Sequence, residues 1–217
     1  MVALGMMELA ARRFGRVAFF RPVVRVGPDE DQSIRMMRSR YGIVTPSDEM
    51  FGVTRAQARQ MLADDRYSNL IQLIQQRFKT LEAKADFVVV EGTSYQGLAP
   101  ELEFELNADI AANIGSRVLS VYAMGNRSVD ECVQSVLIGN ESFVDRGAQL
   151  IATIINQVPD DQSTALNAAI KTSKLDSKAP LYFLPEEPLL RQPTVREIQI
   201  GIGAKLVSGD ESSLDRE

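Results

Sequence analysis

The chain has 217 residues, of which 45% are hydrophobic and 24% charged, and its formal net charge is −5. This length allows one sizeable domain with a buried core, or one domain and part of a second. It contains no histidine and a single cysteine, Cys132, which excludes histidine-based catalysis, an internal disulfide and multi-cysteine metal sites. A mildly acidic chain with dispersed basic residues is also a poor candidate for nucleic-acid binding, and no apolar run reaches the roughly 20 residues of a membrane-spanning helix.

The amino-terminal half alternates between helical and strand patterns. Apolar residues at helical spacing predict helices over 3–14, 31–40 and 67–84, and a capping-box pattern of Thr54 and Gln57 predicts a short helix ending near residue 62. Unbroken runs of β-branched and aromatic residues predict strands over 16–24 and 86–90. Residues 41–52 hold a proline and two glycines, so we expect a loop there.

The same alternation continues through the carboxy-terminal half. We expect helices over 102–114, 128–146 and 163–173, the second of them opened by a capping box of Ser128 and Glu131. Strands are expected over 118–122, 150–156 and 181–184. Helices and apolar strands in alternation predict an α/β fold with a mostly parallel sheet flanked by helices.

At both ends, the sequence pattern is that expected of a truncated chain. The first element is a helix, although an α/β sheet of this kind usually begins with a strand whose following loop binds phosphate. The proline-rich residues 185–193 are typical of a linker, and beyond them a third capping box (Thr194 and Glu197) and a strand over 204–207 indicate the start of a second unit. We therefore divide the chain into an α/β domain over 1–190 and an incomplete domain over 191–217.

The chemistry-bearing candidates lie at predicted strand ends. No P-loop motif is present, since the glycine pair Gly92 and Gly97 is followed by Leu98 in place of lysine. Glu91 follows a buried strand, where α/β sheets bind ligands, so its carboxylate is a candidate Mg²⁺ ligand beside a nucleotide; the alternative, which we favour, is a cap of the following turn.

Two further residues carry weaker indications of function. Asn156 ends another predicted strand, where its carboxamide has the donor and acceptor to read an adenine edge, although asparagine also commonly opens turns, and we favour a turn. Cys132 lies among apolar helical positions without a residue to activate it, so we expect a packing role.

Taken in order, several segments resemble the amino-terminal region of long-form bacterial phosphate acetyltransferases. The residues that carry the resemblance are LGMMELAARRFGRVAFFRPV (4–23), YGIVT (41–45), FGVT (51–54), DFVVVEG (86–92) and NADIAAN (107–113). The tail, from PTVREI (193–198) to LDRE (214–217), is similar to the opening of the DRTGG-type domain that follows in that family.

The resemblance implies a dethiobiotin-synthetase-like P-loop domain, which in that family is associated with regulation and assembly and not with acyl transfer. It implies that a first strand and a glycine-rich loop would precede Leu4 and that a catalytic domain would follow Glu217. By the same resemblance, Glu91 and Gly92 match the strand end that faces Mg²⁺, and Asn156 matches the adenine-reading asparagine. With no phosphate loop, these three residues would form a vestigial nucleotide site.

Our leading hypothesis is thus a non-catalytic amino-terminal portion of a phosphate acetyltransferase, whose full enzyme interconverts acetyl-CoA plus phosphate with acetyl phosphate plus CoA. The alternative is a stand-alone module that binds a nucleotide or a partner protein. By the leading hypothesis, ATP with Mg²⁺ would bind to an intact parent domain, and CoA would bind to the catalytic domain alone. The expected partners are the rest of the polypeptide and, in the full enzyme, further copies of it, with no nucleic acid, membrane or disulfide. We expect a cytoplasmic location and, from strands left without neighbours, exposed apolar surface and a tendency to associate.

Overall fold

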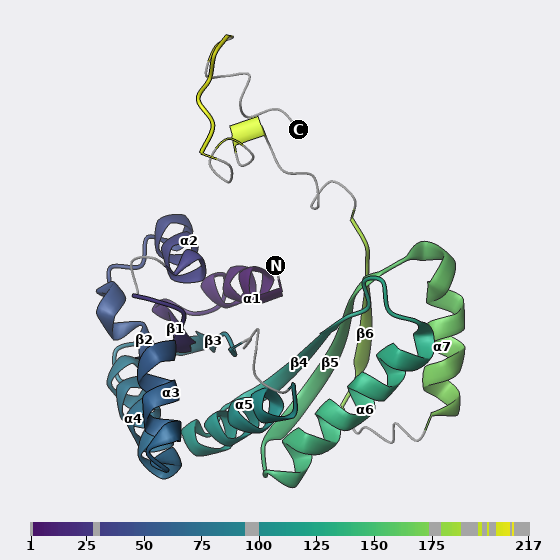
Figure 1. The fold of residues 1–217 in the computed structure, drawn as a ribbon, viewed down its shortest axis with the longest axis horizontal. Coiled ribbons are helices and arrows are strands. Elements are labelled where there is room, and N and C mark those ends of the chain that lie inside the picture. The colour runs from purple at the N-terminus through teal and green to yellow at the C-terminus, as the bar shows by residue number, and fades with distance from the viewer. Residues whose placement is uncertain are drawn as a thin grey trace.

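The computed structural model describes residues 2–27, 31–93, 100–173, 179–187, 195–196, 199, 203–208 and 210, with only the backbone described over 100–103. Its strands form two parallel three-stranded sheets, each flanked by helices (Figure 1). This arrangement confirms the predicted α/β class. It differs from the expectation of one sheet, because within the described part of the chain no ladder joins the strands before residue 94 to those after residue 116.

The first sheet has the order β2-β1-β3. Its central strand β1 (Val17–Val24) pairs with β3 (Phe87–Val90) through residues 17–20 and with β2 (Phe51–Thr54) through residues 21–24. The strand therefore changes partner half-way, at Arg21. The alternation of its side chains also breaks here, since Phe20 and Val23 face the same hydrophobic cluster.

Both faces of the first sheet are covered by helices. α1 (Val2–Ala11) and α2 (Gln32–Tyr41) cover one face, with Phe19 and Val24 in their shared cluster. α3 (Arg55–Ala63) and α4 (Tyr67–Glu82) cover the other face, where all five buried residues of α4 belong to the predicted apolar stripe. A 3-10 turn (Ser47–Glu49) precedes β2.

The second sheet has the order β4-β5-β6, formed by Arg117–Ala123, Gln149–Val158 and Leu181–Pro185. α6 (Val129–Asp145) and α7 (Ser163–Thr172) lie on the same side of it (Figure 1). Their buried side chains pack with Tyr122, Ile155 and Phe183, which are register partners across the three strands. A second 3-10 turn (Asp160–Gln162) leads into α7.

The opposite side of this sheet presents apolar side chains that belong to none of the hydrophobic clusters of the described residues. Val121, Ile154 and Tyr182 are register partners on this side, and Val121 and Tyr182 are 45% and 54% exposed. We call the set formed by Leu119, Val121, Ile154, Tyr182 and Leu184 the open face. Apolar surface is thus exposed on a face of the second sheet, whereas the sequence predicted it at edges of strands left without neighbours.

Helix α5 (Pro100–Ile114) connects the two sheets. Leu106, Ile110 and Ile114 pack into the cluster of the first sheet, and Ala108 and Ala111 pack against Phe143 and Ala148 beside the second. Buried residues on two sides of one helix thus hold the two halves together.

Most predicted elements are found, and both described capping boxes form with their expected hydrogen bonds. The loop expected over 41–52 is wrong at its end, because Phe51 and Gly52 begin β2. A Cβ at position 52 would lie 2.4 Å from the carbonyl oxygen of Pro22, so only glycine lets the two strands approach this closely.

The strand expected over 204–207 is also wrong. Among the described residues they pair with no other strand, and Val207 is almost fully exposed. The third capping box, Thr194 with Glu197, lies outside the described residues. The division into domains at residue 190 stays a prediction.

Candidate functional site

The predicted site residue Glu91 lies where the sequence places it, directly after β3. Its backbone N–H donates to the carbonyl oxygen of Phe20 at 3.0 Å, which extends the β1–β3 ladder by one step. The Glu91 side chain is 34% exposed and therefore remains accessible at the carboxyl end of the first sheet.

Arg21 of β1 lies across this end of β3. Its Nη1 donates to the carbonyl oxygen of Gly92 at 3.0 Å and of Glu91 at 3.4 Å, and the same atom lies 3.3 Å from Oε2 of Glu91. On its other side, Nε of Arg21 lies 3.5 Å from Oδ2 of Asp31. The Arg21 side chain is only 16% exposed, so one guanidinium sits between two carboxylates in a poorly solvated position.

Asp31 reaches this position because it caps helix α2. Its Oδ1 accepts the backbone N–H of Ile34 at 3.0 Å, as an N-cap aspartate does, and this bond fixes the side chain. The remaining oxygen points to Arg21, and the side chain is only 8% exposed. The site therefore joins β1, the end of β3 and the start of α2.

Gly92, the second predicted residue, is packed against Asn107 of α5. The Asn107 side chain accepts the N–H of Thr93 and donates to the carbonyl oxygen of Thr93, both at 2.9 Å. A Cβ at position 92 would lie 3.0 Å from Oδ1 of Asn107, so a side chain there would crowd this bridge. Glycine is thus explained by packing against α5.

Asn156, the third predicted residue, belongs to the second sheet. It was expected to end its strand, but β5 continues to Val158, past an irregularity at which Gln157 takes a positive φ of 58°. The backbone carbonyl of Asn156 accepts the N–H of Met124 at 2.8 Å. No hydrogen bond joins Asn156 to Glu91 or Gly92, which lie in the other half of the molecule.

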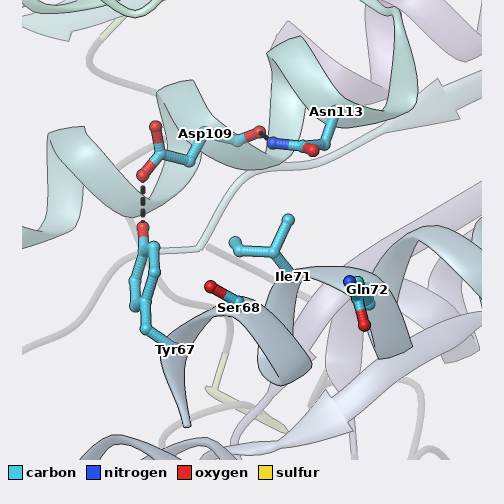
Figure 2. A pocket seen from close by; sticks show the side chains of 6 residues that line it. All are labelled: Tyr67, Ser68, Ile71, Gln72, Asp109 and Asn113. Carbon is cyan, nitrogen blue, oxygen red and sulfur yellow. Dashed lines mark hydrogen bonds between the residues drawn. The ribbon is translucent and has the colours of Figure 1, made fainter. Parts of the chain in front are cut away.

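The pocket in Figure 2 was not found from the sequence. It lies between α4 and α5, has a volume of about 330 Å³ and is lined by Tyr67, Ser68, Ile71, Gln72, Asp109 and Asn113. The Tyr67 hydroxyl donates to Asp109, as the figure shows, and Nη1 of Arg146 also donates to Asp109 at 2.8 Å. Burial raises the pKa of the Tyr67 hydroxyl most, and the hydrogen bond to Asp109 raises it further.

The residues that line this pocket join helices to one another, and we assign them a structural role in place of a catalytic one. Nη2 of Arg146 lies 3.0 Å from Glu105, so the cluster ties α4, α5 and the end of α6 together by hydrogen bonds and ion pairs. Asp109 and Asn113 are four residues apart on α5, a spacing that puts both on one face. That spacing was the one available sequence signal, but Tyr67, the partner of Asp109, lies 42 residues away from it.

The residues do not fit a magnesium site as they stand. Mg²⁺ needs carboxylate oxygens within about 2.1 Å, and here the charge of Glu91 faces a guanidinium. Among the described residues, no three acidic, histidine or cysteine side chains are grouped so that they could hold a metal ion. Cys132 is buried as expected, and desolvation raises the pKa of its thiol.

Within the same described part of the chain, no helix combines the length and the apolar character needed to cross a membrane. This finding agrees with the apolar runs of the sequence, which are short and interrupted by charged residues.

A family model described as an AAA domain matches residues 1–194. The chain is 30% identical over 214 residues to a phosphate acetyltransferase of Nitratidesulfovibrio vulgaris, and 26% identical over 212 residues to one of Synechocystis sp.. Each match covers 96% of this chain and 30% of the relative, so the chain spans less than a third of the length of these curated relatives. A solved arginine decarboxylase of Paramecium bursaria Chlorella virus matches 85% of this chain and 62% of its own, with 11% identity and a TM-score of 0.37, a likeness too weak to inform fold or function.

Proposed function

The chain belongs to the AAA domain family, and from this premise we propose that it is a non-catalytic, amino-terminal portion of a phosphate acetyltransferase that serves assembly and regulation. The full enzyme would interconvert acetyl-CoA plus phosphate with acetyl phosphate plus CoA. Residues 191–217 would then begin a DRTGG-type domain, the parent would act in acetate metabolism, and a cytoplasmic location would keep the thiol of Cys132 reduced.

The open face is the observation that carries the assembly role. Parallel sheets occur almost always with both faces covered, because their strands are apolar on both sides. The first sheet follows this rule, whereas the second has α6 and α7 on one side and Val121, Tyr182 and Leu184 exposed on the other. Contiguous exposed apolar patches mark interaction surfaces. We therefore assign this face to contact with another copy or with the rest of the polypeptide.

The non-catalytic role is tested by activity. Purified chain should show no CoA-dependent turnover of acetyl phosphate above a buffer blank, because acyl transfer would belong to the part of the parent beyond Glu217. Turnover that scales with chain concentration, and that survives a second purification step, would overturn this part of the proposal.

The assembly role is tested by a charge placed on the open face. Val121→Lys should weaken self-association of the chain by about tenfold or more, since a lysine ammonium would have to be desolvated in the contact. Ile138→Lys is the matched control, because Ile138 is also an exposed apolar residue but lies on α6, away from this face. Sedimentation velocity over a concentration series measures both, and equal association constants for the two variants would refute the assignment of this face to contact with another copy.

A further inference from the structure

The guanidinium of Arg21 lies at the carboxyl end of the first sheet, between the carboxylates of Asp31 and Glu91. Two carboxylates, Asp31 and Glu91, approach this end of the sheet from α2 and β3, and both face Arg21 within 3.5 Å. Neither distance is as short as the 2.7–2.9 Å of a charge-assisted hydrogen bond. Arg21 therefore interacts with both carboxylates by charge attraction and not through short hydrogen bonds.

The backbone shows that Arg21 is held there by more than charge. Its Nη1 donates to the carbonyl oxygen of Gly92 at 3.0 Å, which ties the guanidinium to the chain just past β3. Arg21 is also the residue at which β1 stops pairing with β3 and begins pairing with β2. The side chain can thus extend over the end of β3, where the ladder has finished.

We infer that Arg21 is the resident cation of this sheet end, and that it prevents Asp31 and Glu91 from binding a divalent metal. A metal ion would need the same oxygens at about 2.1 Å and would stand beside a positive charge in a poorly solvated position. Removing the guanidinium while keeping both carboxylates should therefore create affinity for a divalent cation. This inference is independent of the proposed role in assembly.

The test uses Mn²⁺ as the probe, with binding to the full chain measured by isothermal titration calorimetry and by the electron paramagnetic resonance signal of free Mn²⁺. Arg21→Gln should bind Mn²⁺ at least tenfold more tightly than the unmodified chain, and the gain should disappear in the double variant Arg21→Gln with Glu91→Gln. Arg21→Lys keeps the positive charge and should behave as the unmodified chain does. Arg16→Gln is the matched control, since Arg16 is an exposed arginine at the other end of β1 that is paired with Asp86.

Equal Mn²⁺ affinities of Arg21→Gln and the unmodified chain would overturn the inference. If Arg21→Gln does not fold, as judged by circular dichroism, the comparison of Glu91→Gln with the unmodified chain decides. Sub-millimolar Mn²⁺ binding by the unmodified chain that Glu91→Gln abolishes would also overturn it, whereas unchanged, weak binding by both would support it.

Discussion

Replacing Asn140 by alanine should remove the centre of a buried polar network that joins α6 to the second sheet. The Asn140 carboxamide accepts hydrogen bonds from Ser120 at 2.9 Å and Tyr122 at 3.1 Å, and donates to Thr153 at 3.0 Å. All four residues are buried. Alanine would therefore leave polar groups of the sheet without this partner in a site closed to water.

The expected cost follows from the fate of those groups. Ser120 and Thr153 are hydrogen-bonded to each other at 2.9 Å and keep that bond, whereas Tyr122 loses its acceptor at position 140. A buried polar group left without a partner costs about 1–3 kcal/mol, and the removed side-chain atoms leave a small cavity in addition. We expect Asn140→Ala to lower the free energy of unfolding by about 3 kcal/mol, a large part of the roughly 5–15 kcal/mol typical of a domain.

Urea unfolding followed by circular dichroism measures this loss, with Glu141→Ala as the control on the neighbouring exposed position of the same helix. The control should change stability by no more than about 0.5 kcal/mol. A second variant, Asn140→Leu, keeps the volume and removes the polar atoms, so it separates hydrogen bonding from packing. A loss below about 1 kcal/mol in Asn140→Ala would refute the assignment of this network as a stabilising element.

Gly139→Ala should destabilise the chain by about 1–3 kcal/mol in the same urea assay, because a Cβ there would lie 2.2 Å from the hydroxyl oxygen of buried Tyr122; a gain in stability would contradict this packing. Hydrogen bonds from the Arg16 side chain and backbone lower the pKa of Asp86, so its stabilising effect is present above the unfolded pKa of about 3.9 and is lost as the pH falls through the folded pKa. Asp86→Asn should thus lower the melting temperature at pH 7, and this difference should shrink as the pH falls below about 3.9; a pH-independent difference would contradict the pairing. Cys132 should react with a thiol reagent at least about 100-fold more slowly in the native chain than in urea, since its exposure requires opening of the fold; equal rates would show that it is accessible.

The helices, strands and caps that are determined by residues close in sequence could be predicted from the sequence. The capping boxes of Thr54 with Gln57 and of Ser128 with Glu131 span three residues each, and both form. Strand β2 was missed because four residues that include Gly52 carry little local pattern. Its strand conformation comes from pairing with β1, which lies some 30 residues away.

The candidate site was predictable in part for the same reason. The position of Glu91 at a strand end follows from the apolar run before it, but its partner Arg21 is 70 residues away and lies in a strand that carried no sign of function. Asn156 was expected to end its strand, where the apolar run of isoleucines stops, yet the pairing of β5 with β6 continues to Val158. A contact between remote segments leaves no periodic trace in either one.

The position of α5 bears on how the chain reaches its folded state. Each sheet is built from a continuous stretch of chain, residues 17–90 for the first and 117–185 for the second, so most strand pairing joins segments within one stretch. Such segments can pair without waiting for the other half to be synthesised. Helix α5 lies between them and packs on both, through Leu106 and Ile110 on one side and Ala108 on the other. We therefore expect its docking to couple the two halves into one cooperative unit, so that amide hydrogens of α5 gain protection only when both halves are in place.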